Sequence, residues 1–147
     1  MRAAGCYQVD SVFYTGTRYD RAVKLNTDTK HVSHKIPLCS VDCLLSAIPE
    51  NMSKVCVEFA LGAIPLPTYQ HPENAFYIFG PEDGTIRQSI IDQADAVVYV
   101  PTVGCMNLAA TVNVLLYDRL AKSSNCNTGD ELIRASRDTN NRLIVKK

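Results

Sequence analysis

Two uninterrupted apolar runs stand out in the chain, Ala-Phe-Tyr-Ile-Phe at 75–79 and Ala-Val-Val-Tyr-Val at 96–100. Apolar runs without polar alternation are typical of strands that are buried on both faces, as in a parallel sheet. Residues 9–15 and 54–61 are rich in β-branched, aromatic and other apolar residues, which favours two further strands. The pattern therefore predicts a mostly parallel sheet.

Apolar residues at helical spacing separate these runs. Ser40 can cap a short helix over residues 41–48, and Thr85 can cap a crossover helix over residues 85–94. A long helix is predicted from residue 107 to about 122, because its apolar residues fall on one side. Alternating strands and helices predict an α/β fold with helices on both faces of the sheet.

Three segments are less regular. Residues 62–72 contain three prolines, which predicts an ordered loop rather than a helix or a central strand. Residues 19–25 have an ambiguous helical pattern. Residues 123–147 are polar with a basic end, which is typical of a mobile tail or a small terminal hairpin. The 147 residues are enough for one well-buried domain, which we place at residues 1–122.

Composition narrows the functional classes. Fifteen Lys and Arg residues balance fifteen Asp and Glu residues, so net charge by itself argues weakly against a nucleic-acid partner. The six cysteines are expected to be reduced thiols in a cytoplasmic protein, since no secretory signal opens the chain. No apolar run is long enough to span a membrane. His31, His34, Cys39 and Cys43 lack the spacing of a structural zinc site, so we expect no metal.

The loops that follow the two apolar runs carry the candidate chemistry. Because carboxyl ends of neighbouring parallel strands meet at one edge of a sheet, both loops are expected to line one crevice. In the first loop, Gly80 lets the backbone approach a ligand, and Glu82 can accept hydrogen bonds from a hydroxyl or an amine. An equally weighted alternative is a helix-entry turn in which Glu82 favours the helix dipole.

The second loop contains Gly104, Cys105 and Asn107. Asn107 as a simple helix cap is about as well supported as a role in ligand binding, because Asn is a favoured capping residue. A helix N-terminus lowers the pKa of a thiol, but no local base accompanies Cys105, so a nucleophilic role is disfavoured.

Together these segments resemble the SpoU/TrmH branch of the SPOUT RNA methyltransferases. Phe-Gly-Pro-Glu-Asp-Gly at 79–84 resembles motif two, and Val-Pro at 100–101 with Gly-Cys-Met-Asn-Leu-Ala-Ala at 104–110 and Leu-Leu-Tyr-Asp at 115–118 resembles motif three. Arg-Ala-Ala-Gly-Cys at 2–6 resembles the second half of motif one. The similarity covers roughly residues 1–122, with three motifs in the right order.

The resemblance implies a C-terminal trefoil knot, an exception to the rule that chains do not thread loops. It further implies an S-adenosylmethionine-dependent enzyme that methylates ribose 2′-hydroxyls of tRNA or rRNA as a homodimer. Carried over by position, the catalytic residues are Arg2, Glu82 and Asn107. The cofactor-binding residues are Leu61, Gly62, Gly80, Val100, Cys105 and Met106.

The chain departs from the family pattern at its start and at one pocket position. Family members carry a strand and an Asn before the arginine, whereas Met1 stands directly beside Arg2 here. Many relatives have Ser at the position of Cys105, and a thiol is the weaker hydrogen-bond partner. A cofactor- or RNA-binding module that has lost turnover with its shortened first motif is therefore one alternative to the enzyme. A flavodoxin-type nucleotide-binding domain, which the two loops also permit, is another.

Overall fold

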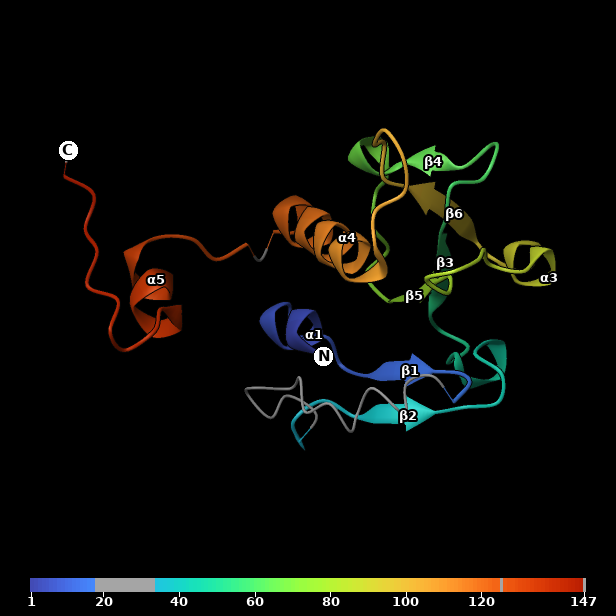
Figure 1. The fold of residues 1–147 in the computed structure, drawn as a ribbon, viewed down its shortest axis with the longest axis horizontal. Coiled ribbons are helices and arrows are strands. Elements are labelled where there is room, and N and C mark those ends of the chain that lie inside the picture. Colours follow the sequence, from blue (N-terminus) through green and yellow to red (C-terminus); the bar gives the residue numbers. More distant parts are fainter. Residues whose placement is uncertain (18–33, 125, 147) are drawn as a thin grey trace.

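The computed structural model of the chain describes residues 1–17, 34–124 and 126–146, in which two parallel sheets form (Figure 1). The larger sheet has the strand order β4-β6-β3-β5. Its strands are β3 (Ser53–Val57), β4 (Ile64–Pro65), β5 (Ala75–Phe79) and β6 (Ala96–Tyr99). All of its pairings are parallel, which confirms the predicted α/β class and the mostly parallel sheet.

The prediction that the strands at 75–79 and 96–100 are neighbours is wrong, because β3 lies between them and pairs with both. A central strand of a parallel sheet pairs with a neighbour along each edge and is covered on both faces, so its side chains must tolerate full burial. Val55 and Cys56 in β3 meet this requirement, since each is 0% exposed. β3 is also shorter than the predicted strand 54–61, because it ends at Val57.

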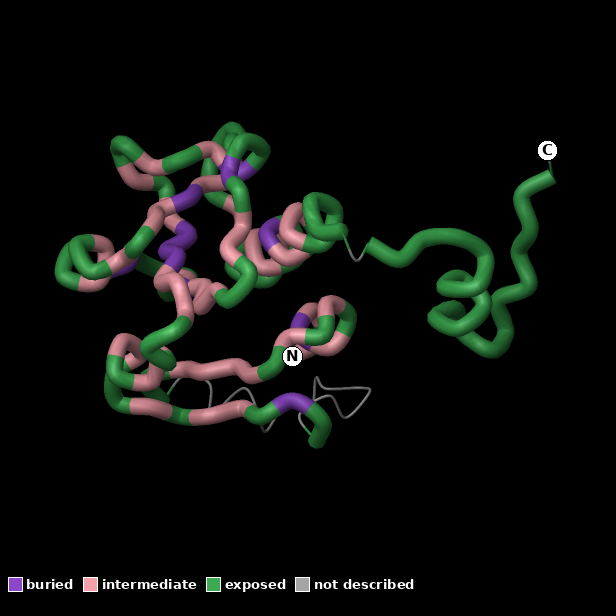
Figure 2. The backbone as a smooth tube through the Cα atoms, turned by 180° about the vertical axis from the view of Figure 1, so that it is seen from behind, coloured by how far each residue is buried: buried purple, intermediate pink, exposed green. Residues whose placement is uncertain are grey.

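Alternate residues of the central strands point to opposite faces, and each face has its own hydrophobic cluster. Figure 2 shows buried segments of the backbone within the larger sheet and in α4. Val55, Val57 and Val98 pack on the side of helix α4 (Leu108–Lys122), around the fully buried Leu115. Cys56, Val97 and Ile78 pack on the other side, against residues of α3 (Gln88–Ile91) and η2 (Leu45–Ala47). Helices therefore cover both faces, as predicted.

Of the three predicted helices, one is confirmed, one is shorter than predicted, and one is wrong. The long helix begins and ends as predicted, with Asn107 as its N-cap. The crossover helix is shorter than predicted: α3 begins after Arg87, and Thr85 is not its cap. The predicted helix at 41–48 is wrong, since Ser40 ends strand β2 (Leu38–Ser40) and only the one-turn 3₁₀ helix η2 follows. Pro49 ends this segment, because a proline disfavours the helical conformation of the residue before it, and Ile48 is extended.

The N-terminal part forms helix α1 (Arg2–Cys6) and a separate two-stranded sheet of β1 (Val12–Tyr14) and β2. β1 is shorter than the predicted strand 9–15. The Phe13 ring lies 5.4 Å from the Phe76 ring of β5, which joins the two sheets. The ambiguous segment 19–25 lies outside the described residues.

The loop predicted at 62–72 contains the short edge strand β4 and the 3₁₀ helix η3 (Leu66–Thr68). The polar C-terminal segment contains helix α5 (Asp130–Ser136) instead of a hairpin, and Figure 1 shows it extending away from the sheets. All its described residues, 126–146, are exposed. The trefoil knot stays a prediction.

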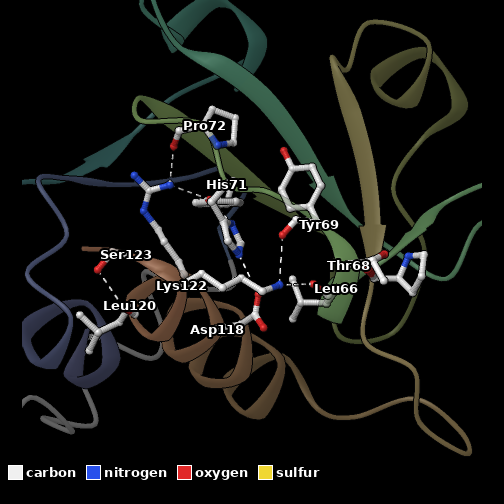
Figure 3. Close-up of polar contacts among 12 residues, drawn as sticks. Leu66, Thr68, Tyr69, His71, Pro72, Asp118, Leu120, Lys122 and Ser123 are labelled. Carbon is white, nitrogen blue, oxygen red and sulfur yellow. Dashed lines mark hydrogen bonds and ion pairs between the residues drawn. The ribbon is translucent and has the colours of Figure 1, made fainter. Parts of the chain in front are cut away.

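A polar cluster fastens the C-terminal half of α4 to the loop after η3 (Figure 3). His71 has its Nε2 2.9 Å from Oδ2 of Asp118 and its Nδ1 2.7 Å from the Tyr77 hydroxyl. Lys122 Nζ lies 2.7 Å from the same Asp118 oxygen, and Arg119 donates to the Tyr77 hydroxyl at 2.9 Å. The cluster attaches the C-terminal half of α4 to the rest of the fold, and the N-terminal end of the same helix lines a pocket.

Candidate functional site

A pocket opens at the carboxyl edge of the larger sheet, where β3, β5 and β6 end and α4 begins. This is the edge at which parallel α/β sheets place their ligands. The lining residues are Val57, Glu58, Phe59, Phe79, Gly80, Pro81, Glu82, Gly84, Tyr99, Val100, Cys105, Met106, Leu108 and Thr111. The two loops singled out in the sequence thus share one pocket, although a strand separates those that carry them.

The loop after β5 forms one wall of the pocket. Gly80 and Glu82 both line it, and the Glu82 side chain is exposed. Because α3 begins only after Arg87, five residues beyond Glu82, that carboxylate is not in the first turn of the helix. The helix-entry interpretation of Glu82 therefore loses its structural basis.

The loop after β6 forms the opposite wall with the start of α4. Gly104 adopts a φ of 87°, a left-handed conformation that favours glycine, and the chain then turns so that Cys105 and Met106 line the pocket. Asn107 is the N-cap of α4, and its Oδ1 accepts a hydrogen bond from the Ala110 N–H at 2.8 Å. The capping interpretation of Asn107 is confirmed, and its side chain is not among the pocket-lining groups.

Three other predicted site residues lie outside the pocket lining. Leu61 is fully exposed at the turn between β3 and β4, and Gly62 follows it with a φ of 84°. Arg2 is the first residue of α1 and is exposed. The structure therefore brings together Gly80, Glu82, Val100, Cys105 and Met106, and it does not bring Arg2, Leu61 or Gly62 to them.

Sequence reasoning missed Glu58, which also lines the pocket. It directly follows β3, and its two carboxylate oxygens accept hydrogen bonds from the N–H groups of Phe59 (3.0 Å) and Ile86 (2.9 Å). The available signal was the single acidic residue in the otherwise apolar stretch 55–61. That residue was absorbed into a strand predicted to run past it.

The charges around the pocket have one sign. Glu58 and Glu82 are acidic, and none of the described lining residues is Lys, Arg or His. Burial, with a smaller contribution from the charge of Glu58, raises the pKa of the neighbouring Cys56 thiol to about 11. Such a pocket favours a cationic group and disfavours a bare phosphate.

Apolar side chains supply most of the remaining lining. The Phe59 and Tyr99 rings lie 5.6 Å apart at the strand ends, and Phe59 is 47% exposed. Aromatic and aliphatic groups of this kind provide a surface for a flat heterocycle. The pocket therefore suits a ligand with an aromatic part and a positive charge.

Metal-ligating clusters and membrane-spanning helices are both absent from the part of the chain that the structure describes. Residues 1–17, 34–124 and 126–146 contain no group of three His, Cys, Asp or Glu side chains arranged to hold a metal ion; His31 of the sequence pattern lies outside this set. Within the same ranges, no helix combines the length and the apolar character needed to cross a membrane.

Comparison with known families adds to the geometry. The profile described as SpoU rRNA Methylase family matches residues 1–117. That range contains the first two sequence motifs, the third as far as Tyr117, and every pocket-lining residue. No curated protein sequence matches the chain.

Solved structures share the fold at low sequence identity. The SpoU methyltransferase AviRb from Streptomyces viridochromogenes aligns with a TM-score of 0.62 and 14% identity over 82% of this chain and 53% of its own. A Porphyromonas gingivalis protein assigned to the TrmH family of RNA methyltransferases aligns with a TM-score of 0.67 and 10% identity, covering 83% and 53%. AviRb in complex with the cofactor AdoMet aligns with a TM-score of 0.60 and 14% identity, over 80% of this chain and 49% of its own. The chain thus spans about half the length of these structures.

Proposed function

The chain belongs to the SpoU rRNA methylase family, and we propose that it is an RNA methyltransferase that moves a methyl group from S-adenosylmethionine to a ribose 2′-hydroxyl of tRNA or rRNA. The observation that carries the proposal is the shared pocket. Loops from three strand ends meet there, with two carboxylates and no basic side chain among the described lining residues.

The chemistry of this donor set fits the cofactor. Its sulfonium is positively charged and its adenine is flat, which suits acidic side chains beside aromatic and aliphatic ones. We propose that Gly80, Val100, Cys105 and Met106 hold it, with Glu82 on the same wall as Gly80. A flavodoxin-type nucleotide site is less well supported, because no basic side chain and no glycine-rich phosphate loop is found among the described pocket residues.

The bound cofactor supplies an activated methyl group, and the chain's own task is alignment. Holding two reactants in place lowers a barrier by several kcal/mol, roughly 7 or more in the best cases. The walls at 80–84 and 104–108 are the elements that define the orientation of a ligand between them.

A ribose hydroxyl is a weak nucleophile, so a positive charge near the developing alkoxide contributes to its reactivity. We propose Arg2 for this role, with a phosphate of the RNA as its second contact. Arg2 is outside the pocket lining of its own chain. We therefore propose a homodimer in which Arg2 of one copy completes the pocket of the other.

Two measurements test the function. Titration calorimetry with S-adenosylmethionine is expected to show one saturable site per chain, and incubation with tritiated cofactor and total RNA is expected to give acid-insoluble radioactivity. Ribose methylation is then read from alkaline hydrolysates, because a 2′-O-methyl group protects the adjoining phosphodiester bond.

The same measurements separate the alternatives. Binding without methyl transfer favours a module without turnover, a second candidate supported by the position of Arg2 outside the pocket. Absence of binding overturns the methyltransferase proposal. Glu82→Gln tests the contribution of the pocket carboxylate to binding and transfer. Glu50→Gln is its matched control, because Glu50 is an exposed carboxylate at the turn before β3.

A further inference from the structure

We propose that Glu58 is a positioning residue of the cofactor pocket, which joins the end of β3 to the loop after β5 and so holds two walls of the pocket together. The inference rests on the proposed function, since it concerns the same pocket. It assigns a role to a side chain outside the three sequence motifs.

Glu58 connects segments that are far apart in the sequence. Its backbone N–H donates to the carbonyl of Val98 in β6 at 2.9 Å, which extends the β3–β6 pairing by one residue. Its side chain reaches to the opposite neighbour, where Oε2 accepts from the Ile86 N–H at 2.9 Å. Oε1 accepts from the Phe59 N–H at 3.0 Å and fixes the conformation of the side chain. One residue at the end of β3 is thus hydrogen-bonded both to β6 and to the loop that follows β5.

Gly80 provides the space for this carboxylate. A Cβ atom at position 80 would lie 3.1 Å from Oε2 of Glu58 and 3.3 Å from both the backbone nitrogen and Cγ1 of Ile86. Gly80 is not among the residues with positive φ, so its backbone conformation alone does not require glycine. A side chain at position 80 would instead crowd the hydrogen bond between Glu58 and Ile86.

The Ile86 N–H depends on this partner. Ile86 is 8% exposed and precedes α3, so its N–H is satisfied by the carboxylate rather than by a helical carbonyl. A buried N–H that loses its acceptor is costly, and a charged acceptor is stronger than a neutral one. Glutamine at position 58 offers one oxygen and one NH₂ group to two N–H donors. Glu58→Gln therefore leaves one donor unpaired with little change in shape.

The test measures cofactor binding by calorimetry on the full chain, at a temperature at which every variant is folded. Glu58→Gln, Glu58→Ala and Gly80→Ala are each expected to raise the Kd for S-adenosylmethionine about tenfold. The double variant Glu58→Ala/Gly80→Ala is expected to bind no more weakly than Glu58→Ala, because both changes act on the same hydrogen bond between Glu58 and Ile86.

Two controls separate positioning from general destabilisation. Tyr77→Phe removes a hydroxyl of the α4 cluster, away from the pocket, so it is expected to lower the melting temperature and to leave the Kd unchanged. Glu50→Gln removes an exposed carboxylate and is expected to change neither. Glu58 variants that bind as tightly as the wild type overturn the proposal. So does a Tyr77→Phe variant that weakens binding to the same extent.

A measurement without ligand keeps this inference separate from the proposed function. In the free protein, hydrogen exchange of the Ile86 amide is expected to be about tenfold faster in Glu58→Gln than in the wild type. If the wild type does not bind the cofactor, the function fails, and unchanged exchange at Ile86 independently removes the positioning role. If the wild type binds and exchange at Ile86 does not change, the positioning role alone is wrong.

Discussion

Asn107 illustrates how one side chain carries both a motif signal and a structural task. Its Oδ1 accepts from the Ala110 N–H, and its backbone carbonyl accepts from the Thr111 N–H, so the first turn of α4 depends on it. Since α4 supplies the buried Leu115 and lines the pocket through Leu108, the cap also affects the site. Loss of activity on mutation would therefore not by itself show a catalytic role.

Asn107→Ala is expected to lower the free energy of unfolding by about 1 kcal/mol, because an N-cap acceptor is removed. Asn107→Asp is expected to retain the stability, since Asp is an equally good cap and its charge suits the helix N-terminus. Urea unfolding at pH 7 measures both. If Asn107→Asp keeps the stability but loses methyl transfer, the amide has a role beyond capping; equal stability of Asn107→Ala and wild type would contradict the capping energetics.

Three cysteine thiols differ in their exposure to solvent, and the fold shifts the pKa values of Cys43 and Cys56 in opposite directions. Cys105 is exposed and lines the pocket, whereas Cys56 is fully buried in β3 with a pKa of about 11. Hydrogen bonds from the side chain and backbone of Ser46 lower the pKa of the exposed Cys43 thiol. Reactivity follows thiolate content and access, so these three cysteines are expected to alkylate at different rates.

Iodoacetamide is expected to label Cys43 fastest and Cys56 slowest in the folded protein. Saturating S-adenosylmethionine is expected to slow the labelling of Cys105 several-fold and to leave the rate at Cys43 unchanged. Peptide mass spectrometry over a time course measures all sites in one sample. Equal labelling of Cys105 with and without the cofactor would place the ligand elsewhere.

At the scale of elements, the cluster that fastens α4 contains His71 with both ring nitrogens in contact with polar partners. A neutral imidazole with its proton on Nε2 donates to Asp118 and accepts from the Tyr77 hydroxyl at Nδ1, while the same hydroxyl accepts from Arg119. Burial lowers the pKa of His71; the hydrogen bond and charge of Asp118 oppose this, and the charges of Lys122 and Arg119 add to it. The contact with Asp118 is therefore a hydrogen bond rather than an ion pair near pH 7.

Acid is expected to weaken this attachment. Because the folded pKa of His71 lies below the value of about 6.5 of an unfolded chain, the unfolded state binds the proton more strongly between the two. Stability is complete above about pH 6.5 and falls as the pH drops through that window, by at most about 1.4 kcal/mol per pH unit for one proton. Chemical unfolding of wild type and His71→Gln at pH 5.5 to 7.5 checks this, with a shallower slope expected for the variant. Parallel slopes would show that other groups cause the pH dependence.

The elements also show what sequence patterns determine. The strands β5 and β6 and the helix α4 follow directly from continuous apolar runs and a cap, because these signals are local. Strand order is not local: the placement of β3 between β5 and β6 depends on which strand is best buried by both neighbours. Glu58 was not placed in the pocket because the strand was predicted to run past it to residue 61, whereas Gly80, Cys105 and Met106 lie in loops that follow predicted strand ends. The short helix expected after Ser40 failed because Ser40 belongs to β2, whose pairing partner β1 is distant in the sequence.

At the scale of the whole molecule, the proposed active site is divided between two regions. The pocket lies at the carboxyl edge of the larger sheet, and Arg2 begins α1, outside the pocket lining. A single copy therefore presents the cofactor site without the proposed catalytic arginine. Assembly of two copies would supply it, and an interface that repeats the same surface on both copies would complete two pockets at once.

Mixing two inactive variants tests this arrangement. Arg2→Ala is expected to bind S-adenosylmethionine without transferring the methyl group, and Gly80→Val is expected not to bind it, because its side chain clashes with Glu58 and Ile86. When equal amounts are unfolded and refolded together, half of the dimers are mixed, and each mixed dimer has one intact pocket with one intact arginine. We expect about a quarter of the wild-type transfer activity in the mixture and none in either variant alone. Sedimentation confirms the dimer, and a mixture as inactive as its components would show that Arg2 does not act across copies.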